Sequence, residues 1–282
     1  MNSLSTKTFL KDRYSSYRIL LKKIYILILS RFSFLFSFKT KVKLKIISRP
    51  HYAYCIFNAC QLASKLGLKS ISVVEFGVAT GNGLVCIEEI AADLEKLFDI
   101  NIEIYGFDTS QGLPKPNDYR DLPYHWKEGF FKMDYERLKN KLRKTKLIIG
   151  NLKDTSNTFF EKNSPAPIGA IFHDLDFYSS TKIALNLFKE NNKFFLPRIF
   201  NYFDDIVGTE IELYNDYTGE RLAINEFNEE NKDIKISPCY NLICQNNIMH
   251  WYHQIFITHI FKHNLYSSFI SKENQQIIRD YM

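Results

Sequence analysis

The stretch VVEFGVATGNGLVCIEEI, residues 73–90, constrains the fold more than any other part of the chain. An apolar run reaches Glu75, glycines follow at Gly77, Gly81 and Gly83, and a helical pattern then continues to about residue 98. Glycine lets the backbone turn sharply and approach a ligand, and the helix start behind it presents free N–H groups. The pattern therefore predicts a buried strand, a ligand-binding loop and a helix. It differs from the G-x-G-x-x-G of dinucleotide sites, because here the wide gap comes first.

Strand-like runs recur at residues 102–108, 146–150, 167–176 and 197–206, with helical stretches between them. A strand-like pair with a polar turn near residues 245–247 comes later. This alternation predicts an α/β fold with a central, mostly parallel sheet and helices on both faces. We expect a domain over residues 49–245, preceded by a leader at 1–48 and followed by a C-terminal extension at 246–282.

Acidic residues stand where the predicted strands end, which is where ligands bind in sheets of this kind. Asp108 closes the second strand, where a carboxylate can accept both hydroxyls of a ribose, although it can also cap a turn. The later acids are Asp174, Asp176, Asp204 and Asp205. Neighbouring carboxylates repel one another unless a cation intervenes, and all-oxygen ligands favour Mg²⁺ or Mn²⁺. Helix capping explains one of these four acids well, but not all of them.

Charge is unevenly distributed along the chain. Residues 1–50 hold twelve Lys and Arg against the single acid Asp12, which gives this segment a net charge of +11. Because the net charge of the whole chain is +6, the remaining residues carry −5. A net negative domain disfavours nucleic acid as a partner. The leader also contains an apolar segment at 25–38 that is interrupted by Arg31 and too short to span a bilayer. We expect it to pack on the domain or on a second subunit, or to rest on an anionic membrane surface.

The five cysteines, Cys55, Cys60, Cys86, Cys239 and Cys244, show neither zinc-ligand spacing nor a disulfide framework. Most of them fall within apolar patterns, which indicates core thiols in a reducing cytoplasm. Four histidines near the end (His250, His253, His259 and His263) lack a nearby cysteine and have aromatic and apolar neighbours, so packing or a dimer contact is favoured over a zinc site.

The segments VVEFGVATGNG, YGFDTSQGLPKPNDYRDLPYHW, HDLDFYSSTKIALNLF and LPRIFNYFDDIVG together resemble class I S-adenosylmethionine-dependent methyltransferases. The resemblance extends over about residues 49–230 and is greatest to the macrocin O-methyltransferase-like (TylF-like) group. It implies a Rossmann-like fold in which Glu75, Gly77, Gly81 and Gly83 hold the methionine end of the cofactor and Asp108 holds its ribose. It also implies that Asp174, Asp204 and Asp205 bind Mg²⁺, supported by Asp176, Tyr178 and Ser179. The loop carries Ala79 and Thr80 where many relatives have glycines.

Methyl transfer needs a positioned oxygen nucleophile and a group that removes its proton, and a bound metal supplies both. Asp174, His173 and His125 are the candidate catalytic residues. An acidic site suits the vicinal hydroxyls of a sugar, and Tyr119, Arg120, Trp126 and Tyr178 are candidate contacts to such an acceptor. The aromatic loop at 112–134 is a candidate lid. We expect a small-molecule or glycan acceptor, a cytoplasmic location that extends to the inner face of the membrane, and association into a homo-oligomer.

Two other classes of protein share such a sheet. A nicotinamide-dependent oxidoreductase would require G-x-G-x-x-G and would leave the acids unexplained. A non-catalytic scaffold that retains the fold would bind neither cofactor.

Overall fold

The computed structural model describes residues 36–43 and 46–271, so most of the predicted leader lies outside the described residues. The chain divides into two units, residues 1–53 and 54–282. In the first, the described elements are α2 (Phe38–Lys43) and the beginning of α3 (Pro50–Lys65). Across the described ranges, no helix is both long and apolar enough to cross a membrane.

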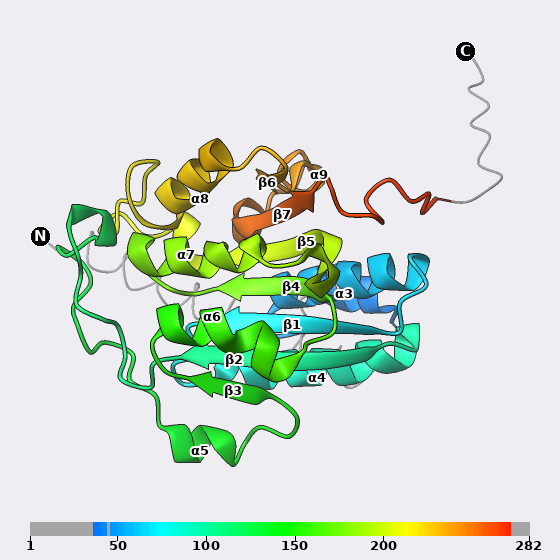
Figure 1. The fold of residues 1–282 in the computed structure, drawn as a ribbon, viewed down its shortest axis with the longest axis horizontal. Coiled ribbons are helices and arrows are strands. Elements are labelled where there is room, and N and C mark those ends of the chain that lie inside the picture. Colours follow the sequence, from blue (N-terminus) through cyan, green and yellow to red (C-terminus); the bar gives the residue numbers. More distant parts are fainter. Residues whose placement is uncertain (1–35, 44–45, 272–282) are drawn as a thin grey trace, which may run out of the picture. The chain divides into compact units, whose positions relative to one another are not determined.

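The second unit is built on a seven-stranded sheet with the order β3-β2-β1-β4-β5-β7-β6 (Figure 1). The strands are β1 (Ser70–Phe76), β2 (Asn101–Asp108), β3 (Lys146–Ile149), β4 (Ile168–His173), β5 (Phe195–Phe203), β6 (Ile234–Pro238) and β7 (Ile255–Ile260). The first five are parallel, and β7 runs antiparallel to both β5 and β6. The predicted mostly parallel α/β sheet is confirmed.

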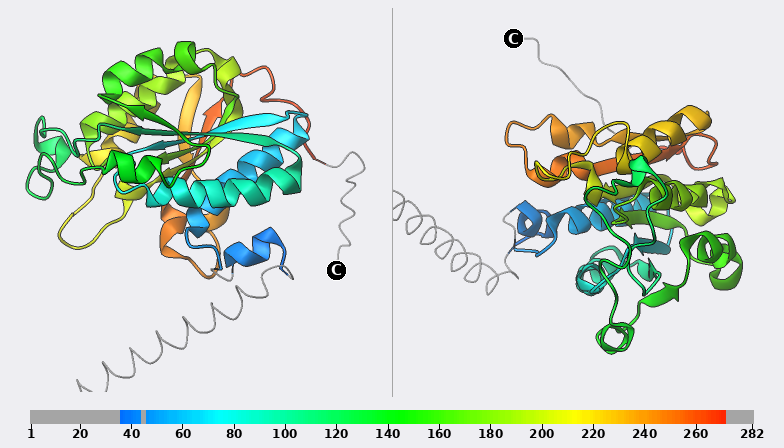
Figure 2. Two further views of the ribbon diagram at one scale, coloured as in Figure 1. Left: turned by 90° about the horizontal axis from the view of Figure 1, so that it is seen from below. Right: turned by 90° about the vertical axis from the view of Figure 1, so that its left-hand side faces the viewer.

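Helices cover both faces of the sheet (Figure 2). The longer ones are α4 (Asn82–Phe98), α6 (Leu152–Asn163), α7 (Tyr178–Leu185) and α8 (Gly219–Glu230), and the short ones are α5 (Tyr135–Lys139) and α9 (Tyr240–Ile243). Single 3₁₀ turns complete the unit at η2 (Tyr119–Asp121), η3 (Asn186–Lys189), η4 (Asn192–Phe194), η5 (Asp204–Ile206) and η6 (His250–Gln254). Helices α6, α7 and α8 lie on one face, and α4 lies on the other together with α3 from Tyr54 onward.

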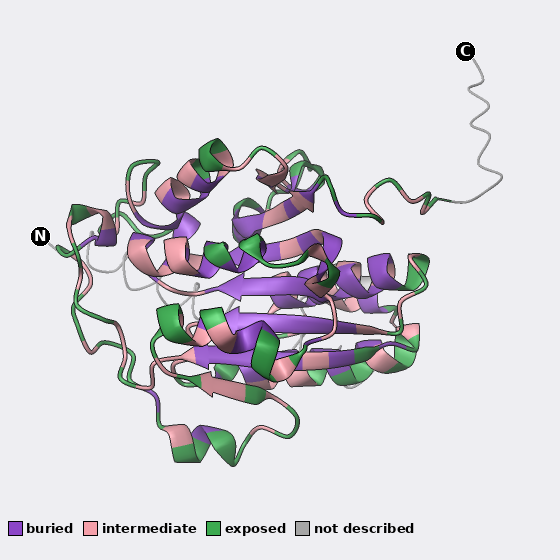
Figure 3. Cartoon of the chain, viewed as in Figure 1, coloured by how far each residue is buried: buried purple, intermediate pink, exposed green. Residues whose placement is uncertain are grey.

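The core follows from the apolar runs of the central strands. Every residue of β4, and every residue of β1 after Ser70, is buried (Figure 3). Strands covered on both faces read as continuous apolar segments, and these two strands lie at the middle of the parallel part. Gly169 of β4 admits α3 closely, since a Cβ at Gly169 would lie 2.9 Å from the Cβ of Ala59.

The chain order reverses between β1 and β4. From β1 the chain builds outward through β2 and β3, and it then returns to place β4 on the other side of β1. Loops that leave two such strands at their carboxyl ends diverge and open a crevice, which is where α/β sheets bind ligands. The glycine loop follows β1 and Asp174 follows β4, so both lie at this point.

Strand β7 lies beyond residue 245, where we expected the domain to end. It nevertheless lies between β5 and β6, pairing Asn201 with Phe256 on one side and Ile236 with Thr258 on the other. The buried Thr258 also accepts a hydrogen bond from Asn201 Nδ2 at 2.8 Å. Residues 255–260 are therefore part of the sheet itself.

Candidate active site

The glycine loop and the end of β4 are in close contact at Gly77. This residue has φ +79°, and a Cβ added to it would lie 1.7 Å from the carbonyl oxygen of Asp174. Asp174 N donates to Phe76 O at 3.0 Å and Gly77 N donates to Phe107 O at 3.0 Å, so the sheet ladder continues into the loop. Only glycine fits a left-handed position this close to another backbone.

Helix α4 begins directly behind this loop. Its N-cap is Gly81, with φ 77°, and no side chain caps the helix there. Gly83 lies over Glu75, because a Cβ at Gly83 would lie 1.8 Å from Glu75 Oε1. The structure thus brings the four predicted cofactor residues of this segment together around the first turn of α4, whose backbone N–H groups favour a negatively charged ligand.

Asp108 ends β2 opposite the glycine loop and binds the loop backbone. Its Oδ2 accepts from Val78 N and Ala79 N, both at 2.9 Å, and its Oδ1 accepts from Ser110 N at 2.6 Å. A carboxylate offers about four acceptor positions, so three are in use. Asp108 therefore holds the loop in shape, a role that the predicted ribose contact did not include.

Five carboxyl groups gather at the ends of β4 and β5, and we call them the acid cluster: Asp174, Asp176, Asp204, Asp205 and Glu220. Asp174 and Asp204 are partly exposed, whereas the other three are buried. Glu220 comes from the first turn of α8 and is fully buried. The partly exposed pair is therefore accessible to a ligand above a buried acidic layer.

Hydrogen bonds within the acid cluster join separate elements. Asp205 Oδ2 accepts from Asp176 N at 2.8 Å and Asp205 Oδ1 accepts from Tyr214 OH at 2.7 Å. Glu220 Oε2 accepts from Asp205 N at 2.9 Å, while Glu220 Oε1 is buried with no hydrogen-bond partner. Asp204 accepts from Tyr202 OH and, through its carbonyl oxygen, from Gln254 Nε2 at 2.7 Å.

Burial and mutual repulsion raise the pKa values of the cluster. Loss of hydration, followed by the charge of Asp204, raises the pKa of Asp205 from 3.8 to about 7. Burial together with neighbouring carboxylates, Asp205 first among them, raises the pKa values of Asp176 and Glu220 well above their usual range. A cation would offset this repulsion, and the all-oxygen donor set matches a hard divalent ion.

The predicted metal ligands have the oxygen donors that a divalent cation needs, but their arrangement is less favourable for binding one. Among the described residues, no group of three or more His, Cys, Asp or Glu side chains is arranged to hold a metal ion. Both carboxylate oxygens of Asp205 already accept protein hydrogen bonds. Metal binding by Asp174, Asp204 and Asp205 would therefore require side-chain rotation.

Two of the predicted acceptor residues meet at the start of α7. The Arg120 guanidinium lies 4.4 Å from the Tyr178 ring centroid and donates to Tyr178 OH at 3.2 Å. Tyr178 OH in turn donates to Glu226 Oε2 of α8 at 2.7 Å, and Arg120 also pairs with Asp118 at 2.8 Å. Both side chains are thus held by protein groups. Tyr119 differs, since 69% of it is exposed.

The loop at 112–134 contacts the segment at 207–218. Tyr124 OH donates to the carbonyl oxygen of Glu212 at 2.5 Å, and His125 Nε2 lies 3.8 Å from Glu212 Oε1. The His125 ring packs edge-on against Trp126 at 4.2 Å. These contacts place His125 and Trp126 beside the segment that carries Tyr214, which donates to the acid cluster.

The other predicted catalytic histidine lies in the interior. His173 is completely buried on β4, stacks on Phe203 at 4.2 Å and has its Nε2 3.4 Å from Asn201 Oδ1. Burial lowers the pKa of His173 to about 3, so the ring is neutral at physiological pH. Its surroundings suit a packing role better than proton transfer with an acceptor.

The sequence reasoning missed three residues of the site: Asp121, Tyr214 and Glu220. The fully buried Asp121 accepts from Ser179 N and Ser179 Oγ at 2.8 and 2.9 Å, and so fixes the start of α7. The resemblance predicts a different role for Ser179, in support of the metal shell. An acid in the first turn of a helix is common, so the sequence around Glu220 carries no distinguishing signal.

Two of the four C-terminal histidines serve local packing. His259 Nδ1 lies 3.0 Å from Tyr266 OH, and His263 Nε2 lies 3.1 Å from Phe195 O. His250 and His253 are exposed on η6. Cys55, Cys60, Cys86 and Cys239 are buried, and Cys244 is exposed.

Comparison with known proteins bears on the fold. No family model matches the sequence, and no curated protein is significantly similar to it. The solved O-methyltransferase NovP is 15% identical, with 74% of this chain and 79% of that chain aligned and a TM-score of 0.50. The calicheamicin methyltransferase CalS11 is 17% identical over 72% and 77% of the two chains, with a TM-score of 0.49. TomG from Streptomyces achromogenes, an O-methyltransferase solved with S-adenosylmethionine, is 11% identical over 73% and 79%, with a TM-score of 0.42.

The likeness to NovP defines the class of fold. The chain has a Rossmann-like fold shared with methyltransferases, as the sequence predicted.

Proposed function

We propose that this protein is an S-adenosylmethionine-dependent O-methyltransferase, assisted by Mg²⁺, that acts on a hydroxyl group of a sugar or related metabolite. One observation carries the proposal. The glycine loop, Asp108 and the acid cluster meet at the carboxyl ends of β1, β2, β4 and β5, where the strand order reverses. The fold shared with the O-methyltransferase NovP supports the same reading.

Each part of the site has a role in this reaction. Gly77, Gly81 and Gly83 allow the close packing that shapes the loop and the start of α4. These backbone groups would hold the methionine end of S-adenosylmethionine, which supplies the methyl group, and Asp108 would face its ribose. A divalent cation held by Asp174, Asp204 and Asp205 would lower the pKa of an acceptor hydroxyl. The two partly exposed carboxylates can orient neighbouring hydroxyls of the acceptor.

Proton removal falls to Asp174 or His125 among the predicted catalytic residues. Asp174 is partly exposed at the cluster, and the His125 side chain is 22% exposed on the loop above it. A catalytic base must come within hydrogen-bond reach of the acceptor, which the complete burial of His173 does not favour.

The acceptor is a hydroxylated small molecule in this proposal. Acidic and aromatic groups suit a sugar, since carboxylates accept from hydroxyls and aromatic faces pack against the ring. Tyr119 is exposed at the loop, next to Arg120, and is available for such packing. A surface glycan or its precursor is the acceptor we favour. The buried thiols suit synthesis in the cytoplasm.

The test is calorimetric titration of the full-length protein with S-adenosylmethionine and separately with NADH, each with and without Mg²⁺. The Asp108→Asn variant keeps an acceptor for the loop amides and loses the negative charge that a ribose diol prefers. We expect micromolar binding of S-adenosylmethionine by the wild type and about tenfold weaker binding by this variant. Asp154→Asn, the same change at an exposed position on α6, is the control.

Each alternative class has its own outcome in this titration. Preferential binding of NADH would replace the proposal with a nicotinamide-dependent oxidoreductase, and binding of neither cofactor would indicate a scaffold. If S-adenosylmethionine binds, Asp174→Asn and His125→Gln are compared for methyl transfer to a panel of sugars and catechols. Activity on catechols alone would refute the sugar acceptor.

A further inference from the structure

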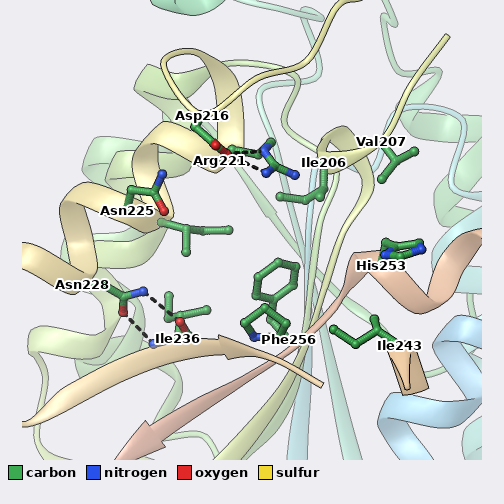
Figure 4. Close-up of a pocket in the computed structure, with 12 residues that line it drawn as sticks. Ile206, Val207, Asp216, Arg221, Asn225, Asn228, Ile236, Ile243, His253 and Phe256 are labelled. Carbon is green, nitrogen blue, oxygen red and sulfur yellow. Dashed lines mark hydrogen bonds and ion pairs between the residues drawn. The ribbon is translucent and has the colours of Figure 1, made fainter. Parts of the chain in front are cut away.

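A cavity of about 310 Å³ lies between α8, β6 and η6, apart from the glycine loop (Figure 4). The Arg221–Asp216 pair lies at one end, and Phe256 and Ile236 lie at the other. The methyl-transfer proposal uses none of its residues. Its volume is at the lower limit of those typical for small-molecule sites.

The floor of the cavity is apolar. Ile206, Ile224 and Ile236 are each less than 5% exposed, and the partly buried Phe256 packs edge-on against Phe203 at 5.4 Å. Such a surface binds a ring or a branched chain, because it removes apolar area from water without leaving a polar group unpaired.

The polar residues divide into those already used by the fold and those available to a ligand. Asn228 is used, since its side chain exchanges two hydrogen bonds with the backbone of Ile236 at 2.7 and 2.8 Å. Asn225 and His253 are exposed at the rim. These two residues can offer polar contacts to a ligand only on the solvent side of the cavity.

Arg221 is the strongest polar group of the cavity. Its Nε donates to Asp216 Oδ1 at 2.7 Å, and the two side chains are 38% and 58% exposed. Ion pairs this exposed contribute little to stability, so an incoming acid group can take the place of Asp216 at low cost. A guanidinium also binds a carboxylate or sulfonate in a bidentate manner.

The cavity shares its wall with the acid cluster. Three elements form this wall, and in each of them residues close in sequence face opposite sides. On the cluster side, Asp205 bonds to both Tyr214 and Glu220. On the cavity side are Ile206, Asp216 and Arg221. A ligand in the cavity would therefore hold the elements that position Asp205.

We propose that this cavity is a second ligand site, which binds a small organic anion with an aromatic or branched apolar body. Arg221 binds the acid group, and Ile224, Ile236 and Phe256 pack against the body. The site is separate from the cofactor loop, and its occupation does not depend on the proposed methyl transfer.

The test uses two fluorescent probes, the anionic 1-anilinonaphthalene-8-sulfonate and the neutral N-phenyl-1-naphthylamine. We expect the wild type to bind one equivalent of the anion. Arg221→Gln should weaken binding of the anion about tenfold, because a charge-assisted contact is lost, and leave binding of the neutral probe unchanged. Asn225→Trp should fill the cavity and abolish binding of both probes.

The matched control is Glu229→Trp, which adds the same ring at an exposed position of α8 outside the cavity. It should bind both probes as the wild type does, and the melting temperatures of all variants establish that they are folded. Saturating S-adenosylhomocysteine should not displace the anion. Displacement by it, unchanged binding by Asn225→Trp, or no saturable binding by the wild type would each overturn the proposal.

Discussion

Two glycines with similar positive φ values have very different surroundings. Gly77 and Gly67 have φ values of +79° and +75°. A Cβ at Gly67 would meet nothing within 4 Å, whereas a Cβ at Gly77 would overlap the Asp174 carbonyl oxygen. Comparing the two separates the cost of the left-handed conformation from the cost of the contact between β1 and β4.

We predict that Gly67→Ala lowers the free energy of unfolding by about 1 kcal/mol, from the left-handed conformation alone. Gly77→Ala should cost roughly 3 kcal/mol or more, because the backbone of β4 must also move. Urea denaturation of the two variants measures the difference. Equal losses would show that the loop does not need its close approach to Asp174.

The acid cluster makes stability depend on pH. Asp205 has a pKa raised from 3.8 to about 7 in the folded state, so folding favours its protonated form. The contribution of protonated Asp205 to the stability of the folded state is fully present below about pH 4 and is lost as the pH rises through 7. We predict that the free energy of unfolding of the wild type falls by roughly 2 to 4 kcal/mol between pH 5 and pH 8 because of Asp205, and that Asp205→Asn does not show this fall.

Thermal melting at the two pH values checks this, with Asp154→Asn as the control. If the cluster binds Mg²⁺, the ion should raise the melting temperature more at pH 8 than at pH 5, because only ionised carboxylates bind it. An identical pH dependence of wild type and Asp205→Asn would contradict the prediction.

At the scale of elements, two connections close over the site, and their contact is small. The loop at 112–134 and the segment at 207–218 meet through Tyr124, His125 and Glu212. Ile211, Leu213 and Tyr217 of the second segment are all more than 60% exposed. A segment with few buried contacts opens at low free energy, so single hydrogen bonds control its exposure.

We predict that Tyr124→Phe makes the 207–218 segment more susceptible to chymotrypsin, by roughly two- to tenfold in cleavage rate, because one hydrogen bond is worth about 1 kcal/mol. Tyr119→Phe, on the same loop at an exposed position, should cleave at the wild-type rate. Cleavage sites are read by mass spectrometry. No increase with Tyr124→Phe would mean that the contact does not restrain the segment.

The elements that could be predicted are those with a local cause. Strands β1 to β5 are apolar runs, and the glycine loop and Asp174 follow from strand ends, so the sequence indicates them. The end of α5 at Lys139 has no such local cause, because the backbone at residues 143–145 bonds with the Glu88 carboxylate. That contact joins residues more than fifty positions apart.

The parts of the site that the sequence does not indicate also depend on contacts between residues far apart in the chain. Asp121 contacts Ser179 across 58 positions, and Glu220 reaches Asp205 from a different element. Likewise, Asp108 was expected to face a ribose from its place in the chain, while its bonds to the glycine loop appear only once β1 and β2 are paired.

At the scale of the whole molecule, the sheet depends on its last strand. We predict that a chain ending at residue 250 fails to reach the native fold, because β5 and β6 both lose their shared neighbour β7. A chain ending at residue 271 keeps every described element and should fold. Circular dichroism and gel filtration of the two chains test this, and a folded, monodisperse shorter chain would contradict it.

The position of β7 also has a consequence for synthesis on the ribosome. The five parallel strands emerge in sequence order, yet β6 can join the sheet only after the later strand β7 has left the exit tunnel and inserted beside β5. Until then the nascent chain presents an open β5 edge, the kind of surface on which chaperones act. The candidate site depends on the same step, because β5 leads directly into Asp204 and Asp205. The native surroundings of these two acids therefore form only after β7 has been synthesised.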